Sequence, residues 1–269
     1  MSKKKILYVT QEMKPFTDIS EMSRIVRELA QSAMESGMEV RILMPRFGTI
    51  NERRHRLHEV VRLSGMNIIV DDDDYPLIIK VASLPGARLQ VYFLDNEEFF
   101  KRKQIFEDAN GKPFDDNQER MIFFCKGVIE TVKKFGWPPD VIHCHGWMTS
   151  LIPVYIKRAY KTEPLFQNSK VVYSAYPNEI SKTFNSDFIE KAQINNLEEE
   201  DLTSFQKNGE INLIEGVQEF ADNIVLSRNS ESDNGFEAIE GEKIRQVEYK
   251  ETPELVEQLI SFYDELTED

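Results

Sequence analysis

The stretch KILYVTQEMKPFTDISEMSRIVRELAQSAMESGMEVRILMP (residues 5–45) decides the fold of this chain. It opens with KILYVT (5–10), a continuous apolar run typical of a strand covered on both faces. Apolar residues then recur with helical spacing from Met22 to Met34, and EVRILMP (39–45) supplies a second strand. A strand–helix–strand unit of this length predicts a right-handed crossover between two parallel strands.

The rest of the chain continues this alternation. A helical pattern covers residues 117–135, and PELVEQLISFYDELTED (253–269) predicts a terminal helix. Between them we expect, in order, the strand DVIHCH (140–145), the helix TSLIPVYIKRAY (149–160), the strand KVVYSAY (170–176), the helix EINLIEGVQEFA (210–221) and the strand NIVLS (223–227). The alternation predicts an α/β fold with a mostly parallel sheet flanked by helices.

Residues 60–95 have a different character. The short β-rich runs NIIV (67–70), LIIKVASL (77–84) and LQVYFL (89–94) lie close together, and PGA (85–87) is a turn signal between the last two. This region predicts a β-hairpin inserted in the sheet or appended to its edge.

Composition narrows the classes of function. The chain has 269 residues, of which 41% are hydrophobic and 30% charged, as in globular proteins. A net charge of −14 disfavours nucleic acid and acidic membranes as partners, and no apolar segment is long enough for a signal peptide or a membrane span. The two cysteines, Cys125 and Cys144, have no zinc spacing and predict buried thiols in a cytoplasmic protein. The acidic runs 71–74 and 198–201 predict solvated loops, with no ligand spacing that indicates a metal site.

Ligands in an open α/β sheet bind outside the carboxyl ends of the strands, so three loops are candidates. The first, QEMKPFTDISEM (11–22), contains no glycine and carries Asp18 and Glu21. A phosphate cradle needs glycines that let backbone N–H groups approach the anion. We therefore expect this loop not to bind phosphate.

The second candidate is HCHGWMTS (143–150). We expect His143 and His145 to point to opposite faces of the strand and therefore not to hold one metal ion. Two interpretations of the histidines stay open: a buried, hydrogen-bonded pair, or a His145 in the loop that donates a hydrogen bond to a ligand. Trp147 likewise either belongs to the core or offers a flat face on which a sugar stacks.

The third candidate, PFDDNQERM (113–121), opens the long helix. Asp115, Asp116 and Asn117 lie where side chains cap a helix, and capping is the favoured interpretation. Polar side chains at a helix start also hold sugar hydroxyls. The spacing of residues alone indicates no nucleophile–base pair.

Taken together, these segments resemble the N-terminal, catalytic domain of bacterial glycogen synthases and plant starch synthases of the ADP-glucose type. The resemblance runs in order over residues 4–228. The segments that carry it are KILYVTQEMKPF, EVRILMPRFG, VYFLDNEEFFKR, FDDNQERMIFF, GWPPDVIHCHGWMTSLIPVYIK and LIEGVQEFADNIVLS. FDDNQERMIFF is similar to the family's Tyr-x-Asp-Asn-x-x-Arg-Phe segment, and DVIHCHGW to its Asp-Ile-Val-His-x-His-Asp-Trp pattern.

The resemblance implies the GT-B fold, in which two Rossmann-like domains enclose the reaction. Residues 1–269 would form one GT-B-type N-terminal domain, with 229–269 as a C-terminal extension that ends in a helix. It implies transfer of glucose from ADP-glucose to an α-1,4-glucan (glycogen or maltooligosaccharide), without a metal or other cofactor. By matching position, the catalytic residues are His145 and Asp116, and the substrate-binding residues are Asn117 and Trp147.

The chain also departs from the family pattern. The Lys-x-Gly-Gly-Leu motif is missing from the first loop, and Gly146 stands where the family has aspartate. Ala175 and Tyr176 replace a histidine–asparagine pair, and the donor-binding domain is not in the sequence. We therefore expect a glycosyltransferase domain that is inactive alone or depends on a separate donor-binding protein. The alternatives are a non-catalytic glucan-binding or regulatory module, and a scaffold that binds something else. Self-association into a homo-oligomer is a further expectation.

Overall fold

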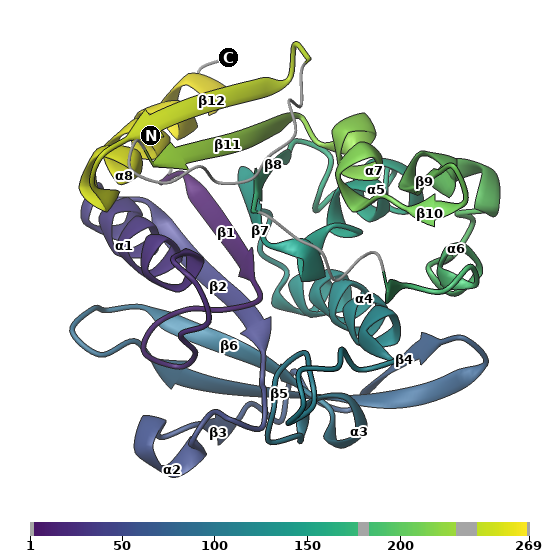
Figure 1. Ribbon diagram of the computed structural model, residues 1–269. Helices are drawn as coiled ribbons and strands as arrows, with labels where there is room; N and C mark the ends of the chain where they lie inside the picture. Colours follow the sequence, from purple (N-terminus) through teal and green to yellow (C-terminus); the bar gives the residue numbers. More distant parts are fainter. Residues whose placement is uncertain (1–2, 177–182, 230–240, 268–269) are drawn as a thin grey trace.

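The computed structural model describes residues 3–176, 183–229 and 241–267 (Figure 1). Within them, ten strands form one sheet in the order β12-β11-β8-β7-β1-β2-β6-β5-β3, with β4 paired to β5. The strands are β1 (Lys5–Thr10), β2 (Glu39–Pro45), β3 (His58–Glu59), β4 (Met66–Val70), β5 (Asp73–Ser83), β6 (Gln90–Asp95), β7 (Val141–His145), β8 (Lys170–Ala175), β11 (Asn223–Asn229) and β12 (Ile244–Tyr249). Every neighbouring pair in the run β12-β11-β8-β7-β1-β2-β6 is parallel. The predicted mostly parallel α/β fold is therefore confirmed.

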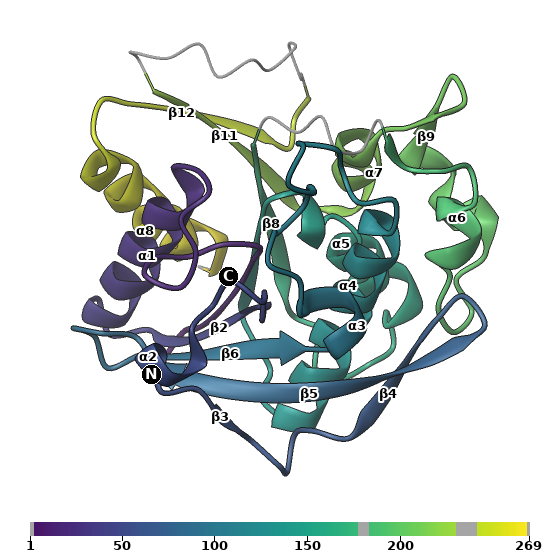
Figure 2. The same ribbon diagram turned by 60° about the horizontal axis from the view of Figure 1, so that its bottom comes forward.

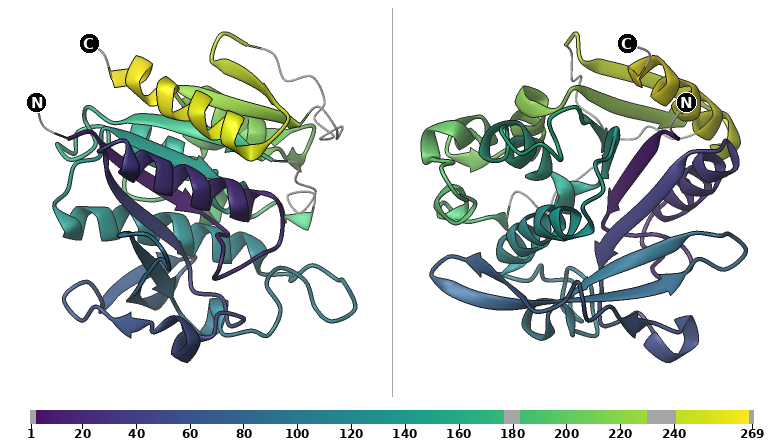
Figure 3. Two further views of the ribbon diagram at one scale, coloured as in Figure 1. Left: turned by 90° about the vertical axis from the view of Figure 1, so that its left-hand side faces the viewer. Right: turned by 180° about the vertical axis from the view of Figure 1, so that it is seen from behind.

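Helices cover both faces of this sheet (Figures 1 and 3). On one face α1 (Met22–Glu35) lies beside α8 (Thr252–Thr267), and on the other α4 (Asn117–Phe135), α5 (Ile152–Val154) and α7 (Leu213–Phe220) pack together. The sheet is buried between two helical layers, which explains the continuous apolar runs of its central strands. Shorter helices are α2 (Glu52–His55), α3 (Glu97–Phe100) and α6 (Phe188–Lys191), and β9 (Gln206–Lys207) and β10 (Glu210–Ile211) form a separate small hairpin.

The predicted hairpin is present at the sheet edge, where β5 pairs antiparallel with β6 through the turn that contains Gly86 (Figure 2). β4 adds a second antiparallel pair to β5. The prediction of a solvated loop over residues 71–74 is therefore only half right. Asp71 and Asp72 form the exposed turn between β4 and β5, but Asp73 and Asp74 begin the strand β5.

The helix predicted over 149–160 is broken. A 3₁₀ helix (Trp147–Thr149), the short α5 and a π-helix (Tyr155–Ala159) replace it, and Pro153 lies in the first turn of α5. Proline has no N–H to donate to the preceding turn, so a regular helix cannot run through it from Trp147. The predicted helix 117–135 is confirmed in full as α4.

The end of the chain folds back onto the sheet. β12 extends the parallel sheet beside β11, and α8 packs on α1. The hydroxyl of Tyr263 on α8 lies 2.5 Å from Nδ1 of His143 in the central strand β7. The predicted terminal helix is therefore present and joined to the core by a buried hydrogen bond. Residues 230–240 and 268–269 of the expected extension lie outside the described residues.

Candidate functional site

The order of strands reverses at β1, which lies between β2 and β7. Such a switch point leaves a crevice at the carboxyl ends of the neighbouring strands, where α/β proteins bind ligands. Here the segment after β1 supplies Gln11 and Glu12, the end of β7 supplies His145 and Gly146, and Tyr176 follows β8. These residues, with the loop up to α1, form what we call the switch-point site.

The loop after β1 closes around a carboxylate of its own. Glu12 is 1% exposed, and its Oε2 accepts hydrogen bonds from the backbone N–H groups of Ile19 (2.8 Å) and Ser20 (2.9 Å). The Ser20 hydroxyl also donates to Glu12. Burial raises the pKa of Glu12, against the lowering effect of these hydrogen bonds. Two N–H groups of the kind that bind phosphate are therefore already engaged by an internal anion.

Gly146 makes room for Gln11 and Met22. Its φ of +83° lies in the region that favours glycine, and a Cβ there would come within 2.4 Å of Gln11 Oε1 and 2.8 Å of Met22 Cε. The Gln11 side chain is held in place, since Oε1 accepts a hydrogen bond from the N–H of Met148 at 3.2 Å. The volume next to Gly146, where the family pattern has an aspartate side chain, is thus filled by residues from the first loop.

The prediction that the two histidine rings point to opposite faces of β7 is wrong. Residues two positions apart in a strand share a face, and the ring centroids of His143 and His145 lie 4.0 Å apart. Both side chains are fully buried, and His145 is the last residue of the strand rather than a loop residue. The interpretation as a buried pair is correct for His143, whose Nε2 also lies 2.8 Å from Ser174 Oγ.

His145 differs from its neighbour in its hydrogen bonds. Its Nδ1 lies 3.2 Å from the hydroxyl of Tyr176, but its Nε2 has no partner among the described residues. Burial lowers the pKa of His145 to about 3, and burial together with the neighbouring ring of His145 lowers the pKa of His143 well below its ordinary value. Both imidazoles are therefore neutral at physiological pH, and one buried ring nitrogen is free.

Trp147 belongs to the core in this structure. It is 5% exposed and packs edge-on against Phe106 and Phe184, with ring centroids 5.0 and 5.8 Å away. Its faces are covered by neighbouring side chains, so the core interpretation describes it better than the stacking one.

The polar side chains at the start of α4 are hydrogen-bonded to arginines. The favoured capping interpretation is therefore wrong for Asp116. Asp116 stands at the N-cap position, but its carboxylate accepts two hydrogen bonds from Arg102 and forms no capping bond. Asn117 is buried: its Nδ2 donates to Phe106 O (2.9 Å), and its Oδ1 accepts from Arg120 (2.7 Å). Asp116 remains partly exposed next to this buried network.

Sequence reasoning missed the roles of Gln11, Glu12, Tyr176 and Arg120. Arg120 is fully buried, donates through Nε to Phe99 O (2.8 Å), and lies over three phenylalanine rings. Burial lowers its pKa to about 10. The only signal in the sequence was an arginine on the apolar stripe of α4, because most of its partners come from other segments.

The described residues contain no group of three or more histidine, cysteine, aspartate or glutamate side chains placed to hold a metal ion. No helix among them is long and apolar enough to cross a membrane.

Comparisons with known proteins identify what this fold and site resemble. Residues 5–232 match the family model described as the starch synthase catalytic domain. The chain is 42% identical over 173 residues to the glycogen synthase of Chlorobium limicola, covering 64% of this chain and 35% of that protein. It is 34% identical over 228 residues to the glycogen synthase of Chlorobaculum parvum, covering 84% and 46%. The chain thus spans about a third to a half of the length of the curated relatives it matches.

A solved structure gives the same result for the fold. The catalytic domain of starch synthase IV from Arabidopsis thaliana, bound to ADP and acarbose, superposes with a TM-score of 0.70 at 19% sequence identity. The match covers 83% of this chain and 45% of that chain. The predicted GT-B-type architecture is confirmed.

Proposed function

Because the chain belongs to the starch synthase catalytic domain family, we propose that it is the acceptor-binding domain of an ADP-glucose-dependent glucosyltransferase. The acceptor is an α-1,4-glucan, either glycogen or a maltooligosaccharide. His145 and Asp116 then belong to the reacting centre, while Asn117 and Trp147, whose side chains are buried, support the substrate-binding wall from behind. The two unpaired, buried cysteines support a cytoplasmic location.

The unpaired Nε2 of His145 carries the proposal. A buried polar atom without a partner costs roughly 1–3 kcal/mol, and a sugar hydroxyl would remove that cost. If the Tyr176 hydroxyl donates to Nδ1, the ring proton lies on Nε2 and can be donated to a ligand. The low pKa of His145 keeps the ring neutral over the physiological range, so this donor does not depend on pH.

A separate set of residues bears on how the ADP-glucose donor would be bound. The N–H groups of the loop after β1 are bound to Glu12, and Gln11 and Met22 occupy the space beside Gly146. Stabilising the diphosphate leaving group by fixed charges and dipoles is usually a large part of catalysis in such transfers. We therefore propose that a separate donor-binding unit, or a second chain, supplies those groups.

A non-catalytic glucan-binding or regulatory module is the second candidate. The specific observation in its favour is Gly146, since the aspartate of the family pattern is absent and its space is filled. Both candidates bind glucan, but only the first supports transfer when a donor-binding unit is provided.

The test is incorporation of radiolabelled glucose from ADP-glucose into glycogen. The chain is assayed alone and mixed with the C-terminal half of the Chlorobium limicola glycogen synthase, alongside calorimetric titration with maltoheptaose. The proposal predicts maltoheptaose binding, no incorporation alone, and incorporation in the mixture. Binding without incorporation in any mixture leaves the second candidate, and a flat titration contradicts both.

A matched pair of variants locates the binding. His145→Gln removes the free ring nitrogen, whereas His143→Gln alters a neighbouring histidine whose two nitrogens are already bonded. We expect His145→Gln to weaken maltoheptaose binding at least tenfold, and folded His143→Gln to keep the wild-type affinity. Equal affinities for both variants would contradict the assignment of His145.

A further inference from the structure

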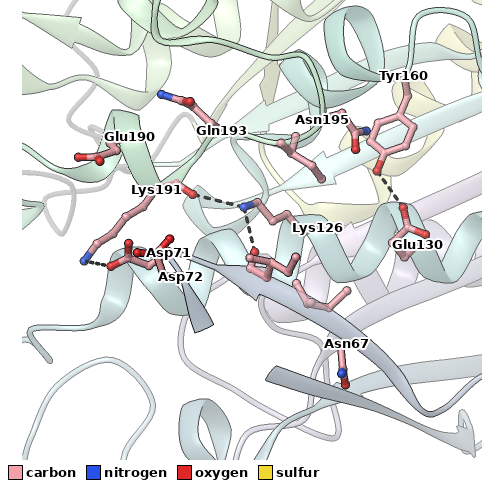
Figure 4. A pocket seen from close by; sticks show the side chains of 13 residues that line it. Asn67, Asp71, Asp72, Lys126, Glu130, Tyr160, Glu190, Lys191, Gln193 and Asn195 are labelled. Atoms are coloured by element: carbon pink, nitrogen blue, oxygen red, sulfur yellow. Dashed lines mark hydrogen bonds and ion pairs between the residues drawn. The ribbon is translucent and has the colours of Figure 1, made fainter. Parts of the chain in front are cut away.

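A second pocket lies between the β4–β5 hairpin, α4 and the segment around α6 (Figure 4). Its volume is about 430 Å³, and no residue named in the switch-point site lines it. The wall contains an apolar part, formed by isoleucines, and a set of polar side chains that includes two lysines, Lys126 and Lys191. We call it the Lys126 pocket.

Lys126 is an unusual lysine. It is 6% exposed, and its Nζ donates hydrogen bonds to two backbone carbonyls, Ile69 O at 3.0 Å and Lys191 O at 3.3 Å (Figure 4). In the described part of the chain it forms no ion pair, and burial lowers its pKa to about 8. An ammonium group carries three hydrogens, so the two carbonyls leave one without a protein acceptor.

Lys191 lines the same pocket but, unlike Lys126, is surrounded by carboxylates. Its Nζ pairs with Glu119 at 2.7 Å, Asp187 at 2.9 Å and Asp71 at 3.6 Å. Burial opposes the charge of Lys191, but hydrogen bonds with Glu119 and Asp187 outweigh it and raise the pKa. One pocket thus presents two amines, one held as a cation and one partly uncharged near neutral pH.

The other walls limit what can enter. The carboxylates of Asp71, Asp72, Glu130 and Glu190 line the pocket, so a ligand that carries phosphate or carboxylate is repelled. Ile69 is 59% exposed and offers an apolar surface. A small uncharged molecule fits this lining better than an anion.

Beside Lys126, one turn further along α4, the lining contains a hydrogen-bonded acid and phenol. Tyr160 follows the π-helix directly, and its hydroxyl donates to Glu130 at 2.8 Å (Figure 4). π-helical turns are rare and occur often at functional sites, which is a second indication that this wall serves a ligand.

We propose that the Lys126 pocket binds a small uncharged aldehyde, which condenses with the Lys126 amine. The nitrogen lone pair attacks the carbonyl carbon, the π electrons move to oxygen, and one nitrogen proton is transferred to that oxygen, which gives the carbinolamine. Loss of its hydroxyl together with the nitrogen proton releases one water and leaves the imine. Lysines without an ion pair in a desolvated pocket are the ones that proteins use for this reaction.

The expected difference in reactivity between Lys126 and Lys191 follows from the fraction of each amine that is uncharged. At pH 7.5, roughly a quarter of Lys126 is uncharged, against about one part in a thousand of a lysine with the ordinary pKa. Lys191 lies below that second fraction because its pKa is raised. Of the two amines in this pocket, Lys126 is therefore the one that we expect to react.

The experiment uses D-glyceraldehyde and its 3-phosphate, two aldehydes that differ mainly in charge. The intact chain is incubated with each at pH 7.5 with sodium cyanoborohydride, which reduces an imine to a stable amine, and labelled lysines are identified by peptide mass spectrometry. We expect Lys126 to be labelled at least tenfold faster than Lys191 and the exposed Lys103, with a rate that saturates in D-glyceraldehyde. The phosphate ester should react several-fold more slowly.

The controls separate binding from simple reactivity. Lys126→Arg keeps the charge and donors but cannot form an imine, so the saturating phase should vanish while the chain stays folded by circular dichroism. Lys103→Arg, at an exposed residue that does not line the pocket, should leave the labelling of Lys126 unchanged. The Lys126 rate should rise with an inflection near pH 8; the titratable groups that face it are Asp71 and Asp72 on the hairpin, Glu130 on α4, Glu190 and Lys191 on α6, and Tyr160.

Two results would overturn the proposal. One is a Lys126 rate no higher than that of Lys103, which would mean that the amine is not activated. The other is a rate that grows linearly with D-glyceraldehyde through the millimolar range, which would mean that no pocket is occupied before reaction.

Discussion

The switch-point site and the Lys126 pocket use polar side chains in opposite ways. At the switch point nearly every group is engaged inside the protein: Glu12 by the loop, Gln11 by Met148, and Nδ1 of His145 by Tyr176. Nε2 of His145 is the exception, with no partner among the described residues. In the Lys126 pocket the key group has only backbone carbonyls as partners and faces an open volume. At both sites packing thus decides which groups are available to a ligand.

The largest expected effect tests whether the switch point is packed. Trp147→Ala should lower the free energy of unfolding by about 3–5 kcal/mol, because it removes a buried ring from between Phe106 and Phe184. Chemical denaturation measures this, with Trp147→Phe as a milder control. A loss below about 1 kcal/mol, of the size expected for a surface residue, would show that the ring is exposed in solution.

Gly146→Asp restores the residue of the family pattern and tests whether its space is filled. We expect a loss of about 2–4 kcal/mol, from the positive φ and from the clash with Gln11 and Met22. Gly136→Asp is a control for a positive φ without a clash, since Gly136 has φ 57° and ψ 35°, against 83° and 164° at Gly146, and nothing lies within 4 Å of its Cβ position. Adding Gln11→Ala should recover part of the loss in Gly146→Asp alone, and equal losses at both glycines would contradict the packing account.

The third effect is a dependence of the free energy of unfolding on pH. Folding lowers the pKa of His145 from 6.5 to about 3, so between these values only the unfolded chain binds the proton. The stability from the neutral ring is present above pH 6.5 and is lost as the pH falls, with a slope of up to ~1.4 kcal/mol per pH unit. Denaturation of wild type and His145→Gln between pH 7 and 4.5 should therefore give a shallower slope for the variant. Parallel curves would mean that His145 is solvated.

The smallest effect sharpens the contrast with the second pocket. Lys126→Met removes a buried cation that has no ion pair, so we expect a gain of about 1 kcal/mol at pH 7, after the loss of two hydrogen bonds. Thermal or chemical denaturation measures it. A clear loss of stability would indicate that Lys126 has a negatively charged partner in solution.

Much of the fold could be predicted because its signals are local. The central strands are continuous apolar runs and α4 has a clear stripe, so periodicity placed them correctly. β12 was missed because IRQVEY (244–249) buries only alternate residues near its end, as suits a strand at the edge of the sheet. The helix over 149–160 was predicted whole because periodicity takes no account of the missing N–H at Pro153.

The site was less predictable because its decisive contacts join distant residues. Gln11 and Met148 are 137 positions apart, and Lys126 bonds to carbonyls 57 and 65 positions away. The roles proposed for His145, Asp116, Asn117 and Trp147 came from the family resemblance, which could not show which of these side chains are buried. A lysine within an apolar helical pattern predicts a solvated residue, so the Lys126 pocket had no signal in the sequence.

One spectrum tests the central claim most directly. The chain has four histidines, so selective ¹⁵N labelling of histidine gives a small set of imidazole resonances to follow during a maltoheptaose titration. We predict that the Nε2 resonance of His145 shifts progressively with ligand, while both ring nitrogens of His143, already bonded to Tyr263 and Ser174, stay in place. A His145 resonance that does not move at saturating maltoheptaose would contradict the account.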